Sequence, residues 1–280
     1  MTQPRNPKLC CLLGDPVEHS LSPLMFNSAF RTTGDDIAYL AFQVKAEDLG
    51  SAIEGLKALG FIGCNVTIPH KTTVVKLLGS MDRSAEISGS VNVIRNENGK
   101  LVGYSTDGSG ALKAMAAAGI VPIGKRIQLL GYGGVARAVA FELAQRAKPK
   151  EIMIAGRDLP KAASLAEDIQ PLVNAEAVPL DQAGGPQVDI LINCTPVGMW
   201  PKVNESPIRK ESLESSTVVF DLVYNPAETL LLKLAKDRGC RTLGGLEMLV
   251  QQGAMAFELW LGKKAPVDIM RKAAEEGLKE

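Results

Sequence analysis

Lys71 lies in the stretch GCNVTIPHKTTV, where local folding gives no reason for a lysine. The apolar run before Pro69 predicts a buried strand, and Pro69 suits the first position of a helix that continues to Leu78. A cation in the first turn of that helix faces the positive end of the helix dipole, which costs about 0.3–1 kcal/mol. Helix formation alone therefore does not explain why a lysine stands at position 71.

An amide and a carboxylate are expected to meet in the stretch SVNVIRNENGKLVGYSTDG. Two β-rich runs flank Asn98-Gly99, which is the strongest short hairpin signal. A two-residue turn places Asn92 opposite Ser105, and Asp107 then lies diagonal to Asn92 on the same face. The alternative is that Asp107 only caps a helix that starts directly after it.

Two further polar features could hold a small acid. Ser20 and Ser22 precede Pro23 and a helical run, and two hydroxyls with free amides at a helix start suit a carboxylate. The alternative is that Ser22 simply caps the helix. Gln252 shares a helix face with apolar residues three or four positions away, so its amide points toward packed material. Either a ligand or nearby backbone would supply its partners.

Residues 131–136, GYGGVA, stand between a predicted strand and a predicted helix. This is the GxGxxA form of the dinucleotide-binding fingerprint in its required context. Gly131 allows the tight turn, Gly133 lets the backbone approach a pyrophosphate, and Ala136 lets the helix pack close to the strand. The alternative is a doubly wound domain without a cofactor.

The next predicted strand ends at Arg157 and Asp158, where such domains meet the adenosine ribose. Arg157 could stack on adenine or pair with a phosphate, whereas Asp158 would repel a phosphate and accept hydrogen bonds from hydroxyls. The alternative is an exposed salt pair in the turn ahead of a helix at 160–168.

Composition limits the possible partners. The charges of the 31 basic and 31 acidic residues cancel, so neither nucleic acid nor an anionic membrane is the expected partner. A small molecule is the expected partner instead. The protein is expected to be a monomer or a homodimer. Residues 1–14 hold too few apolar positions for a signal segment, and no apolar run is long enough to span a membrane, which predicts a cytoplasmic protein. Five cysteines without CxxC spacing are expected to be reduced and structural, and two histidines argue against a metal site.

Strand and helix patterns alternate throughout, which indicates an α/β fold with βαβ units and parallel sheets. A length of 280 residues allows one large domain or two small ones. The clearest seam lies near residues 108–124.

Taken together, these stretches resemble the shikimate dehydrogenase family. The resemblance implies an α/β substrate-binding catalytic domain at 1–108, completed by the C-terminal helices 247–280, and a Rossmann-type doubly wound NAD(P)-binding domain at 109–246. The motifs occur in family order and span nearly the full chain: HSLSP (19–23), NVTIPHK (65–71), VN (91–92), STDG (105–108), GYGGVARA (131–138), NCTPVGM (193–199), DLVYNP (221–226) and MLVQQGA (248–254).

The same resemblance assigns roles. Lys71 is implied to be the catalytic lysine and Asp107 its partner; our hypothesis is that Lys71 takes the proton of the substrate hydroxyl while Asp107 orients both groups. The implied substrate-binding residues are Ser20, Ser22, Thr67, Asn92, Tyr224 and Gln252. The implied cofactor-binding residues are Gly131, Gly133, Gly134, Val135, Ala136, Arg157, Asp158, Thr195, Met199, Val223 and Gly245, with Met199 and Tyr224 near the nicotinamide.

Three positions depart from the family pattern: Phe26, Val93 and Ser105 stand where histidine, threonine and asparagine are usual. The expected activity is NAD(P)-dependent interconversion of shikimate, or a close analogue, and its 3-dehydro ketone. Quinate and aminoshikimate are alternative substrates, and a non-catalytic sensor of such cyclic hydroxy acids is the alternative function.

The expected cofactor follows from the residues after the second strand of the nucleotide-binding domain. NADP-dependent members of the family typically read Asn-Arg-Thr where this chain reads Gly156-Arg157-Asp158. Exchanging threonine for aspartate removes a donor to the 2′-phosphate and adds repulsion. NAD is therefore the expected cofactor, with NADP possible through Arg157.

Overall fold

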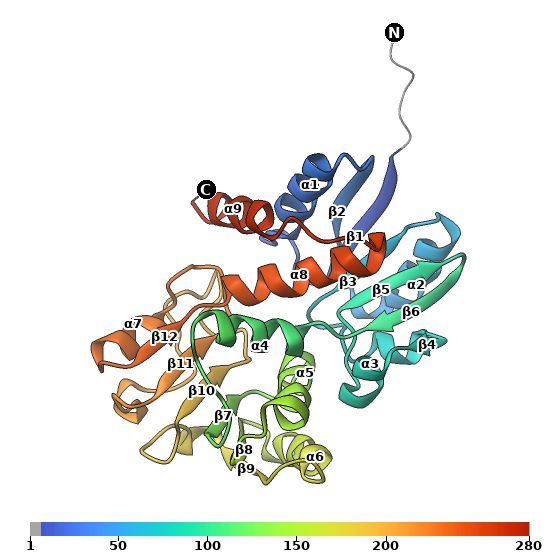
Figure 1. Ribbon diagram of the computed structural model, residues 1–280. Coiled ribbons are helices and arrows are strands. Elements are labelled where there is room, and N and C mark those ends of the chain that lie inside the picture. Colours follow the sequence, from blue (N-terminus) through green and yellow to red (C-terminus); the bar gives the residue numbers. More distant parts are fainter. Residues whose placement is uncertain (1–6, 280) are drawn as a thin grey trace. The chain divides into compact units, whose positions relative to one another are not determined.

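The computed structural model describes residues 7–279, which form two compact units (Figure 1). Unit 1 runs to Asp107 and resumes at Val250, and unit 2 is Gly108–Leu249. The expected domain boundaries at 108 and 247 lie close to these positions. Residues 1–6, part of the stretch expected to lack a signal, and residue 280 lie outside the described residues. Within 7–279 no helix combines the length and apolar character needed to span a membrane.

Unit 1 contains a mixed sheet with the strand order β2-β1-β3-β5-β6-β4. β1 pairs in parallel with β2 and β3, whereas β5 pairs antiparallel with β3 and β6. The expected parallel pairing therefore holds for β1 with β2 and β3, and the antiparallel pair of β5 with β6 is the hairpin predicted at Asn98-Gly99. The strands are β1 (Lys8–Gly14), β2 (Ile37–Gln43), β3 (Gly63–Val66), β4 (Ser80–Met81), β5 (Val93–Glu97) and β6 (Lys100–Tyr104).

The helices of unit 1 follow the alternation expected from the sequence. α8 begins before the boundary between the units and continues into unit 1. The helices and short 3-10 turns are α1 (Ser22–Thr33), η1 (Ala46–Asp48), α2 (Leu49–Ala58), η2 (Val74–Leu77), α3 (Arg83–Ser88), α8 (Leu246–Leu261) and α9 (Val267–Gly277).

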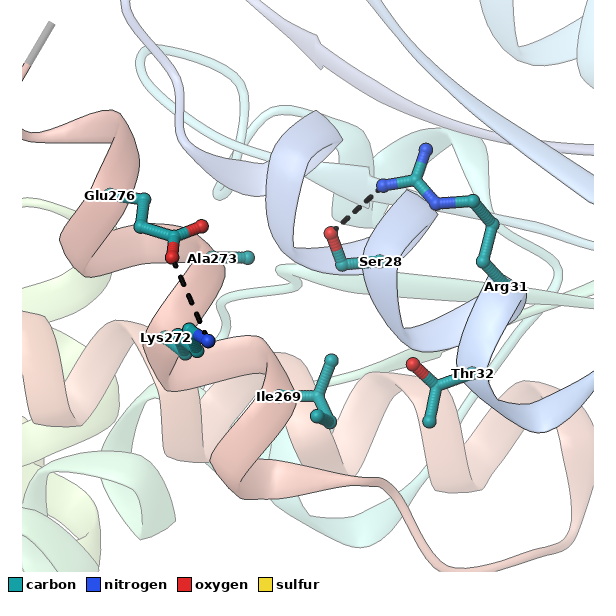
Figure 2. A pocket seen from close by; sticks show the side chains of 7 residues that line it. All are labelled: Ser28, Arg31, Thr32, Ile269, Lys272, Ala273 and Glu276. Carbon is teal, nitrogen blue, oxygen red and sulfur yellow. Dashed lines mark hydrogen bonds and ion pairs between the residues drawn. The ribbon is translucent and has the colours of Figure 1, made fainter.

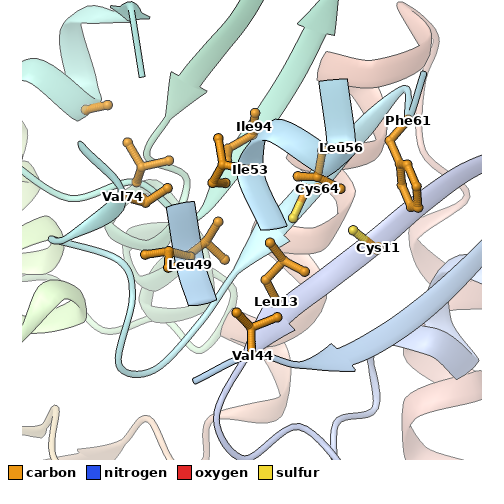
Figure 3. Close-up of a cluster of buried hydrophobic side chains, with 13 residues drawn as sticks. Cys11, Leu13, Val44, Leu49, Ile53, Leu56, Phe61, Cys64, Val74 and Ile94 are labelled. Carbon is orange, nitrogen blue, oxygen red and sulfur yellow. The ribbon is translucent and has the colours of Figure 1, made fainter. Parts of the chain in front are cut away.

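Helix α2 covers one side of this sheet. Leu49, Ile53 and Leu56 recur at helical spacing and pack with residues of β1 and β3, including Cys11 and Cys64 (Figure 3). Burying one such aliphatic side chain contributes about 1.5–3 kcal/mol. The five cysteines all lie within residues 7–279, where they are buried and form no disulfide, so their placement is consistent with a structural role.

Aromatic side chains from α1, β2 and α8 form a second cluster in unit 1. Phe26 stacks on Tyr39 with ring centroids 4.5 Å apart, and Trp260 lies 5.1 Å from Phe26. The Trp260 indole packs directly against Gly63 of β3, so that a Cβ at position 63 would collide with the ring. Phe26, one of the departures from the family pattern, is therefore a core residue.

Unit 2 is a doubly wound parallel sheet with the strand order β12-β11-β10-β7-β8-β9. Two runs of three strands diverge from the β7–β10 pair, which is the Rossmann arrangement. The elements are α4 (Asp107–Ala117, beginning at the last residue of unit 1), β7 (Arg126–Leu130), α5 (Gly134–Glu142), the π-helical turn η3 (Leu143–Ala147), β8 (Glu151–Gly156), α6 (Leu159–Ile169), β9 (Ala175–Pro179), η4 (Leu180–Gln182), β10 (Ile190–Asn193), η5 (Lys210–Ser212), β11 (Val218–Asp221), α7 (Leu230–Asp237) and β12 (Arg241–Leu243).

Candidate active site

Lys71 lies in a turn after β3 and not in an α-helix. The helix predicted from Pro69 to Leu78 is reduced to the single 3-10 turn η2. The reason is a long-range hydrogen bond: the Lys71 carbonyl accepts from the backbone N–H of Val91 at 2.8 Å, so it is directed to another segment and not to the next helical turn. The dipole cost expected for Lys71 therefore does not arise.

The Lys71 side chain forms an ion pair with Asp107. Its Nζ lies 2.5 Å from Asp107 Oδ2, and the two side chains are 15% and 5% exposed. The other carboxylate oxygen, Oδ1, accepts from Asn92 Nδ2 at 3.1 Å. Buried charges are stable only when they are paired with an opposite charge and hydrogen-bonded to further polar groups. The ion pair meets the first condition, and the hydrogen bond from Asn92 meets the second. Asp107 is also the first residue of α4, and its side chain contacts Lys71 and Asn92, so Asp107 does more than begin the helix.

The hairpin that carries Asn92 forms as predicted. Asn98 and Gly99 have φ of 55° and 91°, as a type I′ turn requires, and Val93 pairs with Tyr104. The next residues outward are Asn92 and Ser105, so the predicted register is confirmed. Asn92 Oδ1 accepts from the Thr106 backbone N–H at 2.7 Å, which fixes the amide toward Asp107.

Gln252 of α8 joins the same polar group. Its Oε1 accepts from Asn92 Nδ2 at 3.1 Å, and its backbone carbonyl accepts from the Thr106 hydroxyl at 3.2 Å. The sequence left a ligand and nearby backbone as the alternatives for its partner. The amide oxygen instead meets a side chain 160 positions away along the chain.

A second set of polar residues continues this network toward the start of α1. Tyr39 Oη donates to Asn65 Oδ1 at 2.7 Å, and Asn65 Nδ2 donates to the Asn92 carbonyl at 3.2 Å. The Ser22 hydroxyl also bonds the Tyr39 phenol, whose pKa burial raises well above its usual value. Ser20 Oγ accepts from the Ser22 N–H at 3.2 Å. A chain of hydrogen bonds thus connects the two serines with the Lys71 and Asp107 pair.

Sequence reasoning missed Tyr39 and Asn65, because both lie in apolar strand patterns that look like core. The structure also separates two questions about α1. Its N-cap residue is Leu21 and no side chain caps it, so simple capping by Ser22 is wrong. Thr67, the remaining predicted residue of unit 1, follows β3 and packs its methyl group against Gly14.

The turn after β7 in unit 2 has the predicted strand–turn–helix geometry. Gly131 has φ of +106°, a conformation that requires glycine, and Gly133 precedes α5 with open space around it. Ala136 is fully buried, as close helix packing requires. The half-buried Gly134 and Val135 form the first turn of α5, whose free N–H groups suit a phosphate.

The residues after β8 are arranged differently from the expected salt pair. Arg157 is exposed, whereas Asp158 is the N-cap of α6 and accepts from the Lys161 N–H at 3.2 Å. Lys161 Nζ lies 3.0 Å from the same carboxylate. Hydrogen bonding to Lys161 lowers the pKa of Asp158, and hydrogen bonding to Asp158 raises the pKa of Lys161. The carboxylate is therefore already paired with a cation.

Asp221 connects the loops after β10 and β11. One carboxylate oxygen accepts from Asn193 Nδ2 at 2.9 Å and from the Val223 N–H at 3.0 Å; the other accepts from the Thr229 hydroxyl at 2.6 Å. Asn193 Oδ1 in turn accepts from the Thr195 hydroxyl at 2.7 Å. Burial raises the pKa of Asp221 to about 6, although these hydrogen bonds act in the opposite direction.

The structure brings several predicted cofactor residues together. The Thr195 methyl lies against Gly131, and Gly245 packs against the backbone of Leu222 and Val223. Met199 and Tyr224 are half-buried on the loops after β10 and β11. Tyr224 belongs to unit 2, whereas the other predicted substrate residues belong to unit 1.

A hollow between α1 and α9 is not lined by any predicted site residue (Figure 2). Arg31 Nη2 donates to the Ser28 hydroxyl there at 3.1 Å, and Lys272 Nζ lies 4.0 Å from Glu276 Oε1. Its charged groups are thus engaged with neighbours. Its lining residues are Ser28, Arg31, Thr32, Ile269, Lys272, Ala273 and Glu276. Among residues 7–279, no three His, Cys, Asp or Glu side chains are grouped to hold a metal ion.

A dinucleotide-type turn in one unit and a buried lysine–aspartate pair in the other define a nucleotide-dependent oxidoreductase of two α/β domains. Residues 12–94 match the family model for the shikimate dehydrogenase substrate binding domain, and residues 245–275 match the shikimate 5′-dehydrogenase C-terminal domain. Residues 126–223 match a model for a coenzyme F420-dependent NADP oxidoreductase.

The chain belongs to the shikimate dehydrogenase family. It is 46% identical over 276 residues to shikimate dehydrogenase (NADP(+)) of Moorella thermoacetica, covering 96% of this chain and 93% of that one. A crystal structure of a shikimate dehydrogenase with NADP+ is 44% identical, with a TM-score of 0.90 over 98% of this chain and 96% of that chain. Shikimate 5-dehydrogenase of Listeria monocytogenes, in complex with shikimate and NAD, is 36% identical, with a TM-score of 0.85 over 95% and 96%. NAD(P) is the cofactor of the family, but the NADP names give no support to the expected preference for NAD.

Proposed function

We propose that this protein oxidises shikimate, or a close cyclic hydroxy acid, to the 3-dehydro ketone and catalyses the reverse reduction with NAD(P). The observation that carries the proposal is the ion pair of Lys71 and Asp107, with Asn92 on the second carboxylate oxygen. When bound, the cofactor supplies the hydride acceptor or donor. During oxidation the neutral amine of Lys71 takes the hydroxyl proton and becomes the ammonium that pairs with Asp107; during reduction this ammonium returns the proton to the oxygen.

The surrounding residues divide the remaining work. Asp107 holds the Lys71 amine in one position and keeps it charge-compensated, while Asn92 fixes the carboxylate. Ser20 and Ser22 would bind the acid group. We propose that Thr67, Asn92 and Gln252 hold the ring hydroxyls and that Tyr224 and Met199 face the nicotinamide.

For the cofactor, residues 131–136 would bind the pyrophosphate, and Thr195, Val223 and Gly245 would line the nicotinamide side. We propose that NAD is preferred over NADP, since Asp158 adds no donor for a 2′-phosphate. Its pairing with Lys161 weakens the expected repulsion, so exposed Arg157 leaves NADP usable. Equal or better kcat/KM with NADP would overturn the preference.

Two further parts of the proposal concern the setting. The five free, buried cysteines favour a reducing compartment, so we propose that the protein works in the cytoplasm. That it is a monomer or a homodimer stays a prediction.

The first test is initial rates of nicotinamide reduction with shikimate and quinate, each with NAD and with NADP. Turnover with one pair supports the enzyme. Binding of the acid without turnover in all four would instead favour a sensor or another ring acid, and Val93 and Ser105 would be the residues to revert.

The second test is Lys71→Ala. We expect turnover to fall by about a hundredfold or more, the usual range for loss of a proton-transfer group, with cofactor affinity nearly unchanged. Lys76→Ala, which removes an exposed lysine in η2, is the matched control and should behave as wild type. Comparable losses of turnover and of cofactor affinity after Lys71→Ala would count against the assigned role.

A further inference from the structure

Gly156 is a glycine for a steric reason. It is the last residue of β8, and its φ lies outside the left-handed region that favours glycine. A Cβ at this position would lie 2.6 Å from both Cδ1 and Cε1 of Tyr132, and 3.3 Å from Cβ of Ala162. Carbon atoms do not approach so closely, so the Tyr132 ring occupies the space that a side chain at 156 would need.

The place of this contact matters. Tyr132 is the second residue of the turn after β7, and Gly156 ends the next strand, at the edge of the sheet where domains of this type meet the adenosine ribose. The phenol of Tyr132 also contributes to the raised pKa of Lys161, so it lies near the Lys161 and Asp158 pair. Tyr132 therefore lies beside the end of β8, where domains of this type distinguish the two adenine dinucleotides.

We propose that Tyr132 is a specificity-determining residue for the cofactor: by filling the space beside Gly156, its ring prevents residue 156 from presenting a donor to a 2′-phosphate. This inference rests on the proposed NAD(P)-dependent function. An asparagine at 156 could donate an amide N–H to a phosphate only if the ring were absent. The Tyr132 ring thus confines position 156 to glycine, which offers no side-chain donor to a 2′-phosphate.

The packing is tested by a double-mutant cycle on thermal unfolding. Gly156→Ala should lower Tm in the wild-type chain and have a much smaller effect in the Tyr132→Ala chain, because the ring that it strikes is gone. Gly55→Ala in α2 is the control, since nothing lies within 4 Å of a Cβ at Gly55. An equal loss of Tm from Gly156→Ala in both backgrounds would overturn the packing argument.

The specificity is tested by direct binding of NAD and NADP to the full chain without the acid substrate. The Tyr132→Ala, Gly156→Asn double variant should raise the affinity for NADP relative to NAD by about tenfold or more, which is what one new hydrogen bond to a charged group gives. Gly156→Asn alone, in which the Tyr132 ring is kept, should leave the wild-type ratio unchanged, and a gain equal to that of the double variant would overturn the role of the ring. An unchanged ratio in the double variant would overturn the inference.

These binding measurements separate the two proposals. They need no turnover, so a protein that binds both dinucleotides but leaves shikimate and quinate unreacted would contradict the proposed reaction while still testing Tyr132. A protein that turns over shikimate, with a ratio insensitive to the double substitution, would contradict only the role of Tyr132.

Discussion

Asp221→Asn should change how the stability of unit 2 depends on pH. In the wild-type chain the pKa of Asp221 is raised from 3.8 to about 6, mainly by burial. At about 1.4 kcal/mol for each pH unit, this corresponds to about 3 kcal/mol. The carboxyl group is fully buried, so solvent screening does not reduce this figure.

The sign follows from the raised pKa. Because the folded state holds the proton more tightly than the unfolded state, the favourable contribution is complete below about pH 3.8 and is lost as pH rises through about 6. Above pH 6 the folded protein keeps a buried carboxylate at a cost. The amide of the Asp221→Asn variant does not titrate in this range, so the variant should lack this slope. Relative to the variant, the wild-type chain should lose about 2.4 kcal/mol of unfolding free energy between pH 4 and pH 7.

The assay is urea unfolding at several pH values from 4 to 8, with the difference between the two chains taken at each pH so that other titrations cancel. Trp200 fluorescence in a Trp260→Phe background reports on unit 2, since Trp200 and Trp260 are the two tryptophans and lie in different units. A difference that stays constant across this range, or that changes with the opposite sign, would refute the reasoning.

Two further substitutions test unit 1. Tyr39→Phe removes the donor to the Asn65 amide oxygen while keeping the ring, so the free energy of unfolding should fall by about 1–3 kcal/mol in urea titrations; KM for the acid should rise and KM for the cofactor should not, and an unchanged KM for the acid would leave Tyr39 a purely structural role. Gly63→Ala places a Cβ against the Trp260 indole and 2.6 Å from the Ile94 carbonyl, which should cost about 1–3 kcal/mol and shift Trp260 emission; an unaltered spectrum and midpoint would contradict the packing.

The parts of the fold that the sequence predicted well depend on neighbours in the chain. The turn at Asn98-Gly99 determines the hairpin because both residues tolerate positive φ, and the register then places Asn92 near Asp107. The turn after β7 is likewise determined by Gly131 and the apolar runs on either side. Each of these features could be counted outward from a local signal.

The parts that the sequence did not predict depend on distant partners. The helix expected at Lys71 is absent because the Lys71 carbonyl accepts a hydrogen bond from the backbone N–H of Val91. Tyr39 reads as a core aromatic, and only the fold places Asn65 at its hydroxyl. In each case the structure is determined by a hydrogen bond whose partner cannot be identified from residue type and spacing.

Unit 1 is interrupted in sequence by the whole of unit 2, which has a consequence for biosynthesis. The ribosome makes residues 108–249 before Gln252 and Trp260, which complete the surroundings of Asn92 and Tyr39. At about 5–20 residues per second, the earlier part waits on the order of ten seconds for these partners. Unit 2 is one continuous stretch of chain, so it can fold during that interval. The N-terminal part of unit 1 is therefore made first and finishes folding last. Until α8 leaves the ribosome, the aromatic side chains of α1 and β2 lack their partner and need protection from contact with other chains.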